Sequence, residues 1–158
     1  MTDLQNIYNF MLISEKLATA GQPQAEQLQA IKAAGYETVI NLATIDSKYS
    51  VLNEDEIVKE LGMDYIHIPV VWSSPEPEDL QQFFAAMAAN SDKKLFVHCI
   101  ANMRVSAFIM LYRVIKQGVP YAKAQADMLP IWNPAESNPV WWDFIEVALK
   151  ERGIVSAE

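Results

Sequence analysis

One cysteine stands just before two residues that could assist its chemistry. Cys99 follows the apolar run LFVH at residues 95–98, and Arg104 and Ser106 come within the next seven residues. A thiolate is a nucleophile, a guanidinium grips phosphate or sulfate through paired N–H groups, and a hydroxyl can donate a hydrogen bond to sulfur. The spacing therefore predicts nucleophilic or anion-binding chemistry centred on Cys99.

The elements expected around Cys99 support this prediction. Residues 95–98 have the pattern of a buried strand, and residues 104–116 that of a helix apolar almost all round, which is typical of a central helix. Parallel α/β sheets bind ligands beyond the carboxyl ends of their strands. A helix N-terminus binds anions and favours a thiolate. The alternative is that Cys99 is a small core hydrophobe.

Helical and strand patterns alternate along the rest of the chain, which favours an α/β fold. Strands are expected at 17–20, 36–42, 65–71 and 95–98. Helices are expected at 4–11, 24–34, 54–61, 78–90, 104–116, 121–128 and 140–152, with polar loops at 43–53, 72–79 and 130–139.

Composition limits the classes of protein to consider. The 158 residues fit a single domain over 1–158, and the net charge of −8, without a basic stripe, argues against nucleic acid as a partner. One cysteine excludes an internal disulfide, and with two histidines it argues against structural zinc. No apolar run suits a membrane span and the N-terminus does not resemble a signal peptide, so we expect a cytoplasmic protein, or a periplasmic one if a leader has been removed.

Residues 98–106, HCIANMRVS, resemble the phosphate-binding loop of cysteine-dependent protein tyrosine and dual-specificity phosphatases, whose signature is His-Cys, five residues, Arg, then Ser or Thr. Residues 20–23 (AGQP), 35–42 (GYETVINL) and 66–70 (IHIPV) are similar, in order and spacing, to the bacterial phosphatase-like family DUF442, also found fused to β-lactamase-like hydrolases. The resemblance implies a phosphatase-like α/β fold: a central, mainly parallel sheet of four to five strands with helices on both faces.

The same resemblance implies a function. The chain would hydrolyse phosphotyrosine or another phosphomonoester, in a protein or a small molecule, through a cysteinyl-phosphate on Cys99. His98 would organise the loop and Ser106 would stabilise the thiolate. No metal or cofactor is implied. The phosphate would be held by Arg104 and by the backbone N–H groups of Ile100, Ala101, Asn102, Met103 and Arg104.

The loop departs from the signature, because only four residues separate Cys99 from Arg104. In one alignment the loop has a deletion and Arg104 binds phosphate. In the other nothing is deleted, and Val105 takes the place of the arginine. A six-residue loop also resembles that of rhodaneses, which transfer sulfur through a persulfide. A third hypothesis is a phosphate-binding module without turnover. The loop has no glycine, so Asn102 is expected at any position that needs a positive φ.

A phosphatase of this type also needs a general acid for the leaving group. The matching loop, Trp72 to Asp79, offers Glu76 as our choice, whereas Glu78 and Asp79 fit better in the first turn of the next helix. Asp46, on an earlier loop, is a further candidate. The remaining polar and aromatic residues have structural interpretations: His67 as a satisfied strand histidine, Arg113 as an ion-pair partner, and Trp132, Trp141 and Trp142 as core.

Overall fold

The core of the protein is one mixed sheet. Within residues 3–45, 48–151 and 153, which the computed structural model describes, five strands lie in the order β1-β2-β5-β3-β4. The neighbours β2-β5, β5-β3 and β3-β4 are parallel, and β1 joins β2 antiparallel at one edge. This confirms the mainly parallel sheet. The strands are β1 (Met11–Ser14), β2 (Leu17–Ala20), β3 (Thr38–Asn41), β4 (Asp64–His67) and β5 (Leu95–His98).

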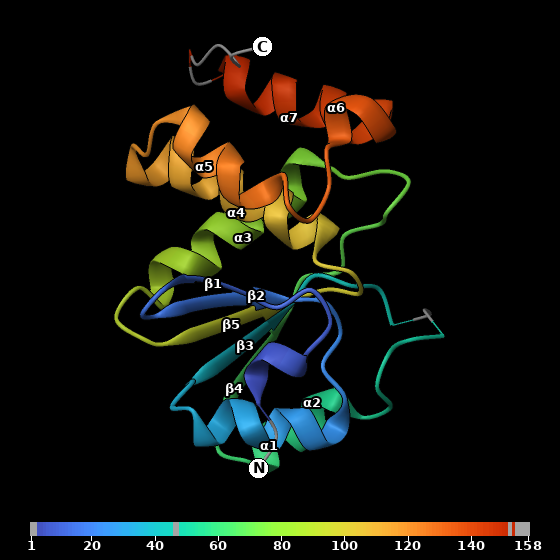
Figure 1. Cartoon of the computed structure of the whole chain (residues 1–158), viewed down its shortest axis with the longest axis vertical. Coiled ribbons are helices and arrows are strands. Elements are labelled where there is room, and N and C mark those ends of the chain that lie inside the picture. The colour runs from blue at the N-terminus through green and yellow to red at the C-terminus, as the bar shows by residue number, and fades with distance from the viewer. Residues whose placement is uncertain (1–2, 46–47, 152, 154–158) are drawn as a thin grey trace.

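Helices cover both faces of the sheet, as expected (Figure 1). On one face lie α1 (Ala25–Ala33) and α2 (Glu54–Glu60); on the other lie α3 (Pro77–Ala89), α4 (Met103–Gln117), α5 (Tyr121–Met128), α6 (Pro134–Ser137) and α7 (Pro139–Glu151). Successive side chains of a strand point to opposite faces of the sheet, so β5 contributes to the apolar layer on each face. Phe96 belongs to the same buried apolar cluster as Leu28 of α1, while Val97 belongs to the cluster that includes Phe108 of α4.

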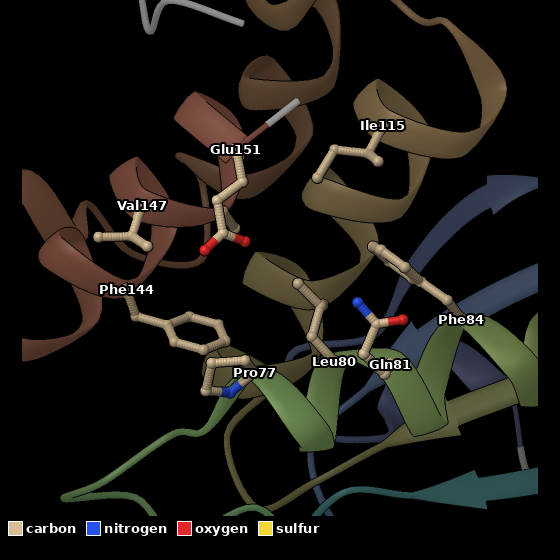
Figure 2. A pocket seen from close by; sticks show the side chains of 9 residues that line it. Pro77, Leu80, Gln81, Phe84, Ile115, Phe144, Val147 and Glu151 are labelled. Carbon is tan, nitrogen blue, oxygen red and sulfur yellow. The ribbon is translucent and has the colours of Figure 1, made fainter. Parts of the chain in front are cut away.

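The central helix α4 is buried along most of its length, as its apolar pattern predicts. It lies against the sheet, with α3 and α7 packed beside it. A small hollow of about 40 Å³ lies between these three helices. Its lining is mostly apolar and includes Leu80, Phe84 and Phe144 (Figure 2). None of its lining residues belongs to the loop after Cys99.

Three expectations about local structure were wrong, the first being the strand expected at 65–71, which ends at His67 in β4. The helix expected at 4–11 is only the 3-10 helix η1 (Leu4–Asn6), and the chain then extends into β1 from Met11. Pairing with β2 explains the difference, because ladder hydrogen bonds outweigh a weak local helical preference. The loop expected at 130–139 contains the single turn α6, which begins at Pro134, a residue favoured at the first helical position.

Candidate active site

Cys99 lies at the carboxyl end of β5, between the parallel strands β2 and β3. Its backbone N–H donates to the carbonyl of Ala20 at 3.3 Å, which continues the pairing of β5 with β2. The residue is 1% exposed, so the sulfur is recessed at the base of the loop. Four residues later the chain has entered α4, and the loop therefore meets the N-terminus of the longest helix described.

The carbonyl groups of residues 99–101 are all held from outside the loop. They accept hydrogen bonds from His98 Nδ1 at 3.1 Å, from the backbone N–H of Gln22 at 3.0 Å and from Asn9 Nδ2 at 2.9 Å, in that order. A trans peptide places its N–H opposite its carbonyl. Three successive peptide planes are therefore fixed with their N–H groups on the side away from these donors.

The corresponding N–H groups have no protein acceptor. No residue in the described part of the chain accepts a hydrogen bond from the backbone N–H of residues 100–104. These donors are joined by the positive end of the α4 dipole. The arrangement is chemically suited to bind an anion above Cys99.

Asn102 takes the left-handed conformation, with φ 65°, as expected for the loop residue most tolerant of it. It is fully buried at the N-cap of α4. Its Nδ2 donates to the carbonyl of Asn9 at 2.9 Å and to Thr19 Oγ1 at 3.1 Å. The loop is therefore tied to β2 and to the turn before β1.

Arg104 carries the only cation of the loop segment 99–106, and its side chain is buried rather than solvated. One guanidinium nitrogen, Nη1, donates to the carbonyl of Val70 at 2.8 Å, and Cζ lies 5.9 Å from the ring centre of Trp72. The side chain thus extends toward the segment that follows β4. Val105, by contrast, is completely buried in the apolar core.

Ser106 is engaged away from the sulfur. Its hydroxyl donates to the carbonyl of Met103 and accepts from Trp132 Nε1, both at 3.0 Å. Trp132 and Trp141 are buried, and both rings pack at a tilt against the ring of Trp72. The carbonyl of Trp72 also accepts a hydrogen bond from Trp141 Nε1. The core interpretation is confirmed for these two indoles, while Trp142 is half-buried at the core's margin.

Sequence reasoning missed Glu54, the residue that anchors His98. Glu54 begins α2, and its Oε2 lies 2.6 Å from His98 Nε2, with both side chains buried. Its other oxygen accepts from Gln22 at 2.7 Å. Burial alone would raise the pKa of Glu54, but the charge and hydrogen bond of His98 and the bond from Gln22 outweigh burial and lower it. The one available signal was a histidine on a buried strand, which needs a polar partner.

The candidate acids lie at the start of α3. Glu76 is exposed at the N-cap, and its backbone N–H donates to Asp79 Oδ2 at 3.0 Å. Asp79 thus caps α3 as expected, although burial raises its pKa, and Glu78 lies exposed in the same first turn. Asp46 lies outside the described residues.

The other interpretations of polar residues are confirmed. His67 ends β4 with Nε2 2.6 Å from the carbonyl of Ala43, and Arg113 pairs with Asp127 at 2.6 Å. Within the described residues, no group of three or more His, Cys, Asp or Glu side chains forms a candidate metal site. No helix in that same part of the chain is long and apolar enough to cross a membrane.

A cavity of about 460 Å³ opens beside the loop. Its walls include Ile100 and Ala101 of the loop, together with Tyr8, Gln22 and Tyr49. It therefore offers space for an organic group beside the loop.

Residues 12–135 match the model of a family described as a DSP-PTPase phosphatase fused to NAD+ kinase. The chain belongs to this phosphatase family. Its relatives include the β-lactamase hydrolase-like protein of Xylella fastidiosa (strain Temecula1 / ATCC 700964), which is 28% identical over 106 residues that cover 65% of this chain and 24% of that protein. The chain thus spans about a quarter of this curated relative's length.

Solved structures of the phosphatase superfamily show the same fold. A DUF442 protein from Shewanella putrefaciens CN-32, assigned as a phosphatase, is 36% identical with a TM-score of 0.85, covering 95% of this chain and 94% of that one. A cysteine-to-serine variant of TpbA from P. aeruginosa, solved with pTyr, is 15% identical with a TM-score of 0.66, covering 95% and 94%. The second likeness concerns the fold alone. Together these matches confirm the resemblance and the fold that it implied.

Proposed function

We propose that this chain hydrolyses phosphomonoesters through a cysteinyl-phosphate on Cys99. The observation that carries the proposal is the loop geometry: the carbonyls of residues 99–101 are all held by hydrogen bonds, and the N–H groups of residues 100–104 have no acceptor among the described residues. Such fixed donors stabilise the charge on the equatorial oxygens of a transferring phosphoryl group. Membership of the phosphatase family supports the same chemistry.

The reaction has two steps. In the first, the Cys99 thiolate attacks phosphorus, so a P–S bond forms while the bond from phosphorus to the leaving oxygen breaks and that oxygen takes a proton. In the second, water attacks phosphorus, the P–S bond breaks, and inorganic phosphate and the thiolate are released. Glu76 is our candidate proton donor, since it is exposed on the segment that continues from Trp72.

Arg104 is the phosphate-binding arginine of the proposal. Its guanidinium has five N–H donors, and the carbonyl of Val70 is the acceptor for Nη1, so further donors can meet phosphoryl oxygens. Val105 is embedded in apolar core and offers no such group. This supports the alignment in which the loop carries a deletion. Ser106 would stabilise the departing thiolate after its hydroxyl turns from Met103 toward the sulfur.

The substrate class follows from the cavity and the family. A leaving group bound between Tyr8 and Tyr49 would lie directly beside Ile100 and Ala101. We therefore expect a phosphorylated protein side chain or a small phosphoester, with phosphotyrosine as the first compound to test. The relative solved with pTyr motivates that choice.

Two contacts favour a second candidate, phosphate binding without turnover. Cys99 is only 1% exposed, and the Ser106 hydroxyl is engaged by Trp132 and Met103. A site that holds phosphate but shields its nucleophile would be a binding module.

Hydrolysis of p-nitrophenyl phosphate by the wild type beside Cys99→Ser tests the proposal. We expect vanadate-inhibited turnover in the wild type and none in Cys99→Ser, while phosphate still binds in calorimetry. Equal turnover by both proteins would refute the mechanism. Phosphate binding without any turnover would establish the binding module, and thiosulfate-to-cyanide transfer that depends on Cys99 would instead indicate sulfur transfer.

A further inference from the structure

Asn9 and the phosphate-binding loop exchange hydrogen bonds across most of the chain. Asn9 Nδ2 donates to the carbonyl of Ala101, and Asn102 Nδ2 donates back to the carbonyl of Asn9, each at 2.9 Å. The partners are 92 and 93 residues apart in sequence. Both asparagines adopt the left-handed conformation, with φ 51° at Asn9 and 65° at Asn102. The reciprocal pair joins the turn before β1 to the loop at its entry into α4.

The bond from Asn9 has a specific consequence for the loop. Because the peptide between Ala101 and Asn102 is planar, holding the Ala101 carbonyl also fixes the direction of the Asn102 N–H. The preceding two peptides are held by the backbone of Gln22 and by His98, whereas this third one depends on a single side chain. Asn9 therefore controls one of the donors nearest the helix.

We propose that Asn9 is a positioning residue of the active site, whose side chain keeps the Asn102 N–H directed at the phosphoryl oxygens. The inference rests on the proposed function, since it needs an oxyanion in the loop. Asn9 acts through the loop backbone and contacts no substrate itself. The benefit is greatest in the transition state, when the equatorial oxygens carry the charge that fixed donors stabilise.

The residue type at position 9 fits this role. Asparagine tolerates a positive φ and also carries an amide donor long enough to reach a neighbouring carbonyl. Glycine would keep the backbone conformation and remove the donor. Aspartate would tolerate the conformation but place a carboxylate oxygen against the Ala101 carbonyl, which repels it.

The test compares Asn9→Gly and Asn9→Asp with the wild type in vanadate binding and in hydrolysis of p-nitrophenyl phosphate. We expect vanadate affinity and kcat to fall about tenfold in Asn9→Gly, and further in Asn9→Asp, because one fixed donor is loosened. The affinity for inorganic phosphate and KM should change less, since both report the ground state. A purely structural role would not separate vanadate from phosphate.

Asn53→Gly is the matched control. Asn53 also has a left-handed backbone, with φ 60°, and is exposed at the N-cap of α2. Asn53→Gly should lower the melting temperature about as much as Asn9→Gly, because both introduce a flexible glycine. Its vanadate affinity should stay at the wild-type value. The inference would be overturned if both Asn9 variants bound vanadate as tightly as the wild type, or if Asn53→Gly lost as much vanadate affinity as they do. Either result would leave the proposed function standing. A wild-type protein that binds neither vanadate nor phosphate would overturn the proposed function and this inference with it.

Discussion

The Nε2 atom of His98 lies 2.6 Å from Oε2 of Glu54, in a pair buried beneath the phosphate-binding loop. The other ring nitrogen, Nδ1, faces the carbonyl of Cys99 at 3.1 Å. A carbonyl only accepts hydrogen bonds, so Nδ1 donates to Cys99 while Nε2 is bonded to the Glu54 carboxyl. The residue before the nucleophile is thus held by a buried hydrogen bond to α2, and through it the first peptide of the loop is oriented.

Glu54→Ala should destabilise the protein strongly. It would leave the buried Nε2 of His98 without its hydrogen-bond partner, which typically costs about 1–3 kcal/mol of unfolding free energy. Urea unfolding at pH 7 measures the loss. Glu56→Ala is the control, because Glu56 is exposed on the same helix and should change stability little. A similar small change for both variants would show that the buried pair contributes nothing measurable.

The same carboxyl predicts a pH dependence of stability. The pKa of Glu54 is lowered in the folded protein from its ordinary value of 4.5, the effect of His98 and Gln22 outweighing that of burial. Its stabilising contribution is therefore complete above that ordinary value and is lost as the pH falls through the folded pKa. Urea unfolding between pH 7 and pH 3 should show the wild type losing stability more steeply than Glu54→Gln. Parallel curves would contradict the assignment.

Arg104→Lys should separate the two alignments of the loop. Lysine keeps the charge but lacks the planar fork that grips two phosphoryl oxygens. We expect kcat/KM to fall about a hundredfold, by analogy with the loss of one fixed oxyanion donor. Arg113→Lys is the control, because Arg113 pairs with Asp127 outside the loop. Unchanged kcat/KM in Arg104→Lys would remove Arg104 from phosphate binding.

Gly21→Ala should disturb the loop by direct contact. A Cβ at this buried position would lie 2.4 Å from the carbonyl oxygen of Ile100 and 3.0 Å from that of Tyr8. Overpacking of this kind costs about 1–3 kcal/mol, and relief by movement of Ile100 would weaken vanadate binding. Gly118→Ala serves as the comparison, since it has open space but φ +69°, so it should lose stability only. Calorimetric titration with vanadate, together with thermal unfolding, checks both halves of the prediction.

Ser106→Ala tests the proposed second step. Trp132 Nε1 would lose its acceptor, at a cost of about 1–3 kcal/mol of unfolding free energy. If the hydroxyl also assists the departing thiolate, the cysteinyl-phosphate should accumulate as a burst of p-nitrophenol followed by slow turnover. Stopped-flow absorbance measures the burst. Lost stability with no burst would confine Ser106 to packing.

Many of the helices and strands around the site could be predicted from local sequence patterns. The β-branched segment around Val39 predicted β3, the apolar run LFVH predicted β5, and the apolar character of 104–116 predicted α4, because burial selects apolar residues along the sequence. The place of Cys99 at a strand-to-helix junction followed from those two elements. The positive φ of Asn102 followed from the absence of glycine in the loop.

The sequence by itself thus determined most of the elements, the nucleophile's position and the family resemblance, since each depends on patterns of neighbouring residues. Only the tertiary structure decided the strand order, the pairing that makes β1 a strand, and the partners of the loop. Glu54 and Asn9 reach it from 44 and 92 residues away, as the antiparallel edge and the crossover helices of the sheet bring them to one side. A polar side chain carries no local signal of a distant partner, because that partner is set by how the whole chain packs.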